Sequence, residues 1–286
     1  MNQKILIVAG IIITVIAGIS YYFTNIENNE EKTPITELTN DRKLVKIDTP
    51  SLFVLYGYEN DYEMVDGVKI WRNAKYELNP EFTELYKEIG ITYEPKSTVV
   101  VYPVFTAAAY SEPGFYTYYR GECDLDCLTV ELKDEYDLTY QASGNAVQVF
   151  SLLGYPIITD IAVDNDPNIL SKYDKVILLH NEYVTRNEFD AITKHPKVIY
   201  LYPNALYAEI TVDYDKNSIT LVRGHGYPAT DISNGFDWVY DNSKYEYNLK
   251  CQEIIFHRIN NGWISDCYPE NLIHRSEELL KQIKDF

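Results

Sequence analysis

Two side chains suited to proton transfer or metal binding, His180 and Glu182, follow an apolar segment, Lys175–Leu179. That segment (KVILL) is typical of a buried strand, so the imidazole and the carboxylate would lie at its carboxyl end. There they could act as a general base or bind a metal. A carboxylate beside a buried strand needs solvent or a partner, and we predict that the pair is catalytic. The alternative is that His180 only hydrogen-bonds neighbouring backbone.

Three further segments carry side chains of the kind that contact ligands. Residues 106–119 combine small residues, a glycine and several tyrosines, residues 202–207 include an asparagine, and residues 223–228 place a histidine between two glycines. Tyrosine-rich loops more often serve packing, and Gly-His-Gly also forms ordinary turns. The functional interpretation predicts four substrate-contacting residues: Tyr116, Tyr183, Asn204 and His225.

Strand-like and helix-like segments alternate between residues 98 and 202, which predicts an α/β fold with a parallel sheet. In such sheets, sites form outside the carboxyl ends of the strands. The segments after Phe105, Leu179 and Tyr202 should therefore gather on one rim. A capping box at Thr185 and Glu188 marks the start of one helix. We predict strands at 98–105, 156–161, 175–179, 197–202 and 252–257, and helices at 145–153, 185–195 and 276–284.

With these residues in place, the region from Thr98 to Ala208 resembles the class I glutamine-amidotransferase-like superfamily. It is most similar to the branch that contains ThuA-like proteins and the C-terminal domain of the N,N-dimethylformamidase large subunit. The resemblance implies a three-layer, flavodoxin-like fold with a parallel sheet, to which this chain adds β elements. It is carried by an Ala-Ala-Ala-Tyr loop ending at Tyr110, by 153–160 (LGYPIITD), by 173–183 (YDKVILLHNEY), by 188–191 (EFDA) and by 202–205 (YPNA).

The resemblance also implies a mononuclear iron held by tyrosine and glutamate ligands, with a histidine nearby. It maps the glutamate onto Glu182, the histidine onto His180 and one tyrosine onto Tyr110, with Tyr116 the candidate for a second tyrosine. Iron, or another divalent or trivalent metal, would then polarise an amide carbonyl or activate water. Ordinary glutamine amidotransferases place a cysteine where this chain has Asn204. Cysteine-dependent glutamine hydrolysis is therefore not expected.

The N-terminal segment predicts export of the rest of the chain. Residues 5–23 carry no charge, follow a lysine and precede acidic residues, as in a single membrane span with its positive end inside. The alternative is a cleaved signal peptide, which would make the protein secreted. We predict a membrane anchor or signal segment at 1–24, a polar stalk at 25–49 and an extracellular α/β domain at 50–286.

The four cysteines fit the same compartment. Four cysteines allow three pairings, and in an oxidising compartment the two local pairs are the simplest. A four-cysteine zinc site is the alternative, although only the first pair has the spacing typical of zinc ligands. We predict the disulfides Cys123–Cys127 and Cys251–Cys267.

The net charge of −18 excludes nucleic acid as a partner, because such a surface repels phosphate. With 27 tyrosines, the chain is expected to be a non-catalytic envelope module that binds a glycan, peptide or protein. The alternative is a metal-assisted hydrolase acting on an amide or a related small polar substrate. The hydrolase requires His180, Glu182 and Tyr110 to converge within about 3–6 Å, whereas the binding module predicts an open aromatic surface.

Overall fold

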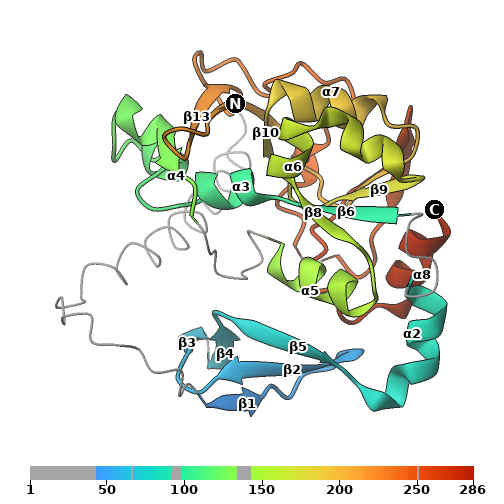
Figure 1. The fold of residues 1–286 in the computed structure, drawn as a ribbon. Helices are drawn as coiled ribbons and strands as arrows, with labels where there is room; N and C mark the ends of the chain where they lie inside the picture. The colour runs from blue at the N-terminus through green and yellow to red at the C-terminus, as the bar shows by residue number, and fades with distance from the viewer. Residues whose placement is uncertain (1–42, 66, 92–97, 134–142, 250) are drawn as a thin grey trace, which may run out of the picture. The chain divides into compact units, whose positions relative to one another are not determined.

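Five parallel strands and one antiparallel edge strand form the main sheet in the computed structural model (Figure 1), which describes residues 43–65, 67–91, 98–133, 143–249 and 251–286. Across the sheet the order is β14-β15-β11-β9-β6-β8. The predicted α/β class with a parallel sheet is confirmed. The strands are β6 (Thr98–Tyr102), β8 (Ile157–Thr159), β9 (Lys175–Leu178), β11 (Val198–Tyr200), β14 (Phe256–Ile259) and β15 (Gly262–Ser265).

Helices cover both faces of this sheet, which explains why its central strands are continuous apolar runs. Alternate residues of each strand enter opposite cores: Val100 and Ile177 belong to one buried cluster, and Val99 and Val176 to the other. Figure 1 shows α5 and α8 on one side of the sheet and α6 and α7 on the other. These helices are α5 (Gly144–Leu152), α6 (Asp160–Asn165), α7 (Arg186–Lys194) and α8 (Glu277–Asp285), and the 3-10 helix η4 (Pro167–Lys172) lies beside α6 and α7.

A second, smaller sheet supports the segments that follow β6 and β9. Its strand order is β10-β12-β13-β7, and its buried face packs with Phe105 and Phe115 in a third core cluster. It therefore holds α3 and α4 against the rim of the main sheet. The elements are α3 (Val104–Ala109), α4 (Phe115–Tyr119), η2 (Leu125–Leu128), β7 (Thr129–Glu131), β10 (Tyr183–Val184), β12 (Ala208–Asp213) and β13 (Ser218–Arg223).

The N-terminal part of the described chain adds antiparallel strands. Phe53 and Leu55 pack in the core cluster that also holds α5 and α8. Strand β1 lies before residue 50, where the sequence predicts the domain to begin. The elements are β1 (Leu44–Lys46), β2 (Phe53–Tyr58), β3 (Tyr62–Val65), β4 (Val68–Trp71), β5 (Ala74–Leu78), η1 (Pro80–Phe82) and α2 (Thr83–Ile89), and a further 3-10 helix, η5, spans Ser243–Tyr245.

Two predicted strands are too long, because an apolar run does not distinguish a buried strand from a buried helix. The run from residue 98 leaves the sheet after Tyr102 and continues as α3, and the run from residue 156 continues as α6 from Asp160. The Asp160 carboxylate connects the starts of these two helices, since its Oδ2 accepts the Phe105 N–H at 2.9 Å near the start of α3. The predicted strand at 252–257 is also displaced: β14 begins at Phe256.

Both predicted disulfides are confirmed. Cys123 is bonded to Cys127 and Cys251 to Cys267, with Cα–Cα distances of 6.1 and 6.3 Å, within the range usual for disulfides. The alternative of a four-cysteine zinc site is wrong, because no cysteine remains free in the described residues. Such disulfides are typical of an oxidising compartment.

Within the described ranges, no helix is both long and apolar enough to cross a bilayer. The predicted span at residues 5–23 lies outside these ranges, as does the stalk from residue 25 to residue 42.

Candidate functional site

Three chain reversals meet at the carboxyl edge of the main sheet. Strand β9 lies between β6 and β11, with Leu178 opposite Val101 on one side and Tyr200 on the other. Because all three strands are parallel, α3, the segment 180–182 and the segment 202–206 leave the sheet on the same rim. The rim gathers the predicted catalytic residues and Asn204.

The Glu182 carboxylate is at the centre of the site and only 1% exposed. Tyr110 donates its hydroxyl to Glu182 Oε2 at 2.9 Å, and the Tyr116 hydroxyl lies 3.4 Å from Oε1. The two phenol oxygens are 2.8 Å apart, and their rings stack with centroids at 4.4 Å. The Glu182 backbone N–H donates to Thr106 Oγ1 at 3.0 Å, which ties the carboxylate to α3. Three oxygen-bearing side chains thus converge on one point.

His180 lies beside this carboxylate and is fully buried. Its Nε2 is 3.3 Å from Glu182 Oε2 and 2.9 Å from Asn204 Nδ2. The hydroxyl of Tyr268 lies 2.7 Å from Nδ1, and the ring of Tyr202 stacks on the imidazole at 5.1 Å. Asn204, predicted to contact substrate, is 3% exposed and contacts His180 instead.

His225 approaches the same carboxylate from the solvent side. Its Nε2 is 4.0 Å from Glu182 Oε1, and its side chain is 25% exposed. The imidazole stacks on Tyr119 with centroids at 4.1 Å. Burial lowers the pKa of His225 below its usual value, while the Glu182 charge opposes that shift, so the ring is neutral at pH 7. A neutral imidazole therefore separates the buried carboxylate from water.

Local sequence features bring Tyr116 back to Tyr110. The turn before α4 passes so close to the chain that a Cβ at Gly114 would overlap the Ser111 carbonyl oxygen. The Gly114 N–H donates to Thr117 Oγ1 at 2.9 Å, which closes the first turn of α4. Only glycine permits this approach, so it sets where the Tyr116 ring lies.

Both phenols are held in the protonated form by their surroundings. Burial raises the pKa of Tyr110 and of Tyr116 well above the usual value, and the negative charge of Glu182 raises both further. The hydroxyls therefore serve as donors to the carboxylate. Either proton would be lost readily only if a cation took its place.

The donor set fits a hard metal ion. Within the described residues, no group of three or more His, Cys, Asp and Glu side chains is arranged to hold a metal, so a site here depends on tyrosine. The phenol oxygens of Tyr110 and Tyr116 are 2.8 Å apart, the Tyr110 oxygen is 2.9 Å from Glu182 Oε2, and the Tyr116 oxygen is 3.4 Å from the other carboxylate oxygen, Oε1. Oxygens that share one cation at about 2.0–2.1 Å are separated by about 2.8–3.4 Å. Carboxylate and phenolate oxygens are hard ligands, and their spacing matches this requirement.

Three residues of the site remain. The sequence predicts one of them, Tyr183, and does not indicate the other two, Tyr268 and Glu246. Tyr183, predicted to contact substrate, is fully buried, with its hydroxyl 3.3 Å from that of Tyr119. Tyr268 reaches His180 from the segment after β15, and nothing in the sequence distinguishes it from the other tyrosines. Burial, and then the charge of Glu182, raise the pKa of Glu246 to about 7. Glu246 therefore lies within the electrostatic field of the site.

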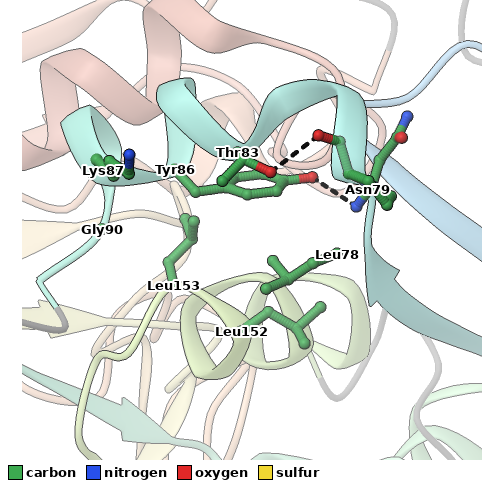
Figure 2. Close-up of a pocket in the computed structure, with 9 residues that line it drawn as sticks. Leu78, Asn79, Thr83, Tyr86, Lys87, Gly90, Leu152 and Leu153 are labelled. Carbon is green, nitrogen blue, oxygen red and sulfur yellow. Dashed lines mark hydrogen bonds between the residues drawn. The ribbon is translucent and has the colours of Figure 1, made fainter.

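A separate cavity of about 360 Å³ lies between α2 and the end of α5 (Figure 2). Figure 2 shows Tyr86 on its wall, with the phenol oxygen accepting the Asn79 N–H at 2.9 Å. The cavity contains none of the predicted site residues, and its described lining has no carboxylate or imidazole. The rim around Glu182, which joins a buried carboxylate to two imidazoles, is therefore the candidate reactive site.

No protein-family model matches the chain, and no curated protein matches it in sequence. Function must therefore be inferred from the residues of the site.

Proposed function

We propose that this chain is a metal-dependent hydrolase of the cell exterior, acting on an amide or a related small polar substrate. The convergence of Tyr110, Tyr116 and Glu182 beside His180 carries this proposal, with Glu182 Oε2 2.9 Å from the Tyr110 hydroxyl and 3.3 Å from His180 Nε2. A fold of the class I glutamine-amidotransferase-like type and an anchor at residues 5–23 belong to the same proposal. The disulfides support the oxidising compartment that it requires.

Tyr110, Tyr116 and Glu182 would hold the metal through their oxygens. When bound, a hard cation such as iron polarises a carbonyl oxygen and lowers the pKa of water. The two phenols would lose their protons on binding, because a cation favours the phenolate that burial and Glu182 now disfavour.

His180 and His225 supply the acid–base chemistry, one on each side of Glu182. His180 is the inner acid–base group, and its ring is fixed by Asn204 and by stacking on Tyr202. His225 is partly exposed and neutral, so it can accept a hydrogen bond from an incoming substrate. The buried His180 would thus transfer protons, while the partly exposed His225 contacts the substrate.

Binding of an envelope glycan, peptide or protein is a second proposal. The tyrosines named for that role are packed around Glu182 rather than displayed on an open surface. A different segment favours binding, because large apolar side chains between residues 239 and 255 face solvent. They are Val239, Tyr240, Tyr247, Leu249 and Ile255, exposed by 85, 38, 68, 42 and 52%.

Metal analysis of the purified full-length chain tests the hydrolase proposal. We expect about one metal ion per chain, with loss in Glu182→Gln and in Tyr110→Phe, which keep the side-chain shapes. Glu122→Gln and Tyr118→Phe are the matched controls and should retain the metal. An iron-loaded chain should also show a visible phenolate-to-iron absorption band that Tyr110→Phe alters. Equal metal content in Glu182→Gln and the unsubstituted protein would rule out this site.

A further inference from the structure

We propose that Tyr268 is a positioning residue that, together with Glu182, sets which nitrogen of His180 carries the proton, and that the Cys251–Cys267 disulfide holds Tyr268 in place. The Tyr268 hydroxyl lies 2.7 Å from His180 Nδ1 and 3.2 Å from Nε2. A role of Tyr268 in catalysis rests on the hydrolase proposal, whereas its effect on the His180 imidazole does not.

Aromatic packing leaves Tyr268 little freedom. Its side chain is buried, and its ring is nearly perpendicular to His180, at 82° with centroids 5.1 Å apart. It is also perpendicular to Tyr202, at 88° and 4.8 Å, while Tyr202 itself stacks on His180. The three rings form one contact group, and within it the phenol oxygen of Tyr268 meets Nδ1.

Electrostatics assigns the proton of the imidazole. Glu182 Oε2 is 3.3 Å from His180 Nε2, and a carboxylate there favours an N–H on that nitrogen. Nδ1 then accepts the Tyr268 hydroxyl. The buried Asn204 Oδ1 has no hydrogen-bond partner among the described residues in its assigned orientation. Turning this amide would present the oxygen to the Nε2–H, so the same tautomer also satisfies Asn204.

The backbone of Tyr268 is held by a junction of two segments, one containing Asn248 and Cys251 and the other formed by residues 266–268. The Tyr268 N–H donates to the Asn248 carbonyl at 3.1 Å, and Asn248 Nδ2 donates to the Asp266 carbonyl at 2.8 Å. The Cys251–Cys267 disulfide joins the same segments, one residue before Tyr268. Without that covalent link, hydrogen bonds of Asn248 would join the described residues of the two segments. We infer that the disulfide limits the movement of the Tyr268 hydroxyl relative to His180.

Nitrogen-15 spectroscopy of the histidine rings tests the positioning directly. The metal-free full-length chain is labelled at its 5 histidines, at a pH that keeps the imidazoles neutral. We expect the His180 signals to show a single Nε2–H tautomer, and Tyr268→Phe to convert them to a mixed pattern. Tyr155→Phe, which removes a buried hydroxyl bonded to the Ile89 carbonyl, should leave them unchanged. An unchanged His180 pattern in Tyr268→Phe would overturn the proposal.

The chain supplies a matched control for the disulfide. Replacing Cys251 and Cys267 by serine should broaden or shift the His180 signals, whereas the same change at Cys123 and Cys127 should not. Should the first pair fail to fold, Asn248→Ala loosens the same junction and is expected to shift the signals in the same direction. A folded junction variant with unaltered His180 signals refutes the role of the disulfide. Because the protein is metal-free, these results stand apart from the metal analysis.

Discussion

Glu270 gives the sharpest test of how burial controls ionisation in this protein. Its carboxyl is buried, its Oε1 accepts the hydroxyl of Tyr202, and Oε2 has no hydrogen-bond partner within the described residues. Burial raises the pKa of Glu270 from 4.5 to about 8. The native protein therefore keeps a proton on Glu270 at a pH where the unfolded chain has lost it.

The sign of the effect follows from proton counting. Between pH 4.5 and about 8 the native state binds more protons at Glu270 than the unfolded state, so the free energy of unfolding falls as the pH rises. A difference of about 3.5 pKa units corresponds to at most about 5 kcal/mol, at 1.36 kcal/mol per unit. This penalty is absent below pH 4.5 and complete above about pH 8.

Replacement of Glu270 by glutamine removes the ionisation and keeps an oxygen that can accept the Tyr202 hydroxyl. We expect Glu270→Gln to have nearly the stability of the unsubstituted protein at pH 5 and to exceed it by several kcal/mol at pH 8. Urea unfolding at pH 5, 6, 7 and 8, followed by circular dichroism, measures this difference. Glu84→Gln, on a side chain that is 84% exposed, controls for the change in net charge. A difference that stays constant from pH 5 to pH 8 would contradict the reasoning.

Two further predictions each remove one side-chain hydroxyl. Thr185→Ala removes the oxygen that accepts the Glu188 N–H at 3.2 Å at the start of α7. This change should lower the free energy of unfolding by about 1 kcal/mol. Urea unfolding measures it, with Thr193→Ala, near the end of the same helix, as the comparison. Tyr110→Phe removes a donor to the buried Glu182 and should destabilise the metal-free protein by about 1–3 kcal/mol. Tyr118→Phe, measured in parallel, should change stability by less than about 0.5 kcal/mol.

The sequence predicts the sheet well where each residue contacts a core. Val176 and Ile177 enter opposite core clusters, so the strand had to be apolar throughout, and this is visible in the sequence. The capping box at Thr185 and Glu188 is likewise a local pattern, and both of its hydrogen bonds are present. The parallel order of the strands then implies the rim that joins His180 and Glu182 to Tyr110.

Contacts from distant segments are not predictable in this way. Tyr268 meets His180 across 88 residues of sequence, and its position depends on a junction with Asn248 that no local pattern encodes. The start of α3 has a similar origin, because the carboxylate that receives the Phe105 N–H belongs to Asp160, 55 residues later. The extent of these elements is decided by tertiary hydrogen bonds rather than by propensity.

The buried carboxylates of this chain differ in what they accept. Asp160 accepts a backbone N–H near the start of α3, and Glu188 accepts one at the start of α7. Each of these two acids therefore completes a helix that the fold requires.

Glu182 has no such role. Within the described part of the chain, its carboxylate receives no backbone N–H, and its partners are the phenols of Tyr110 and Tyr116 and the imidazoles of His180 and His225. No lysine or arginine in this part of the chain forms an ion pair with it. A buried charge is costly unless a partner offsets it, and helix capping does not account for keeping this one. A bound cation would satisfy the carboxylate and both phenols together, as the proposed metal site requires.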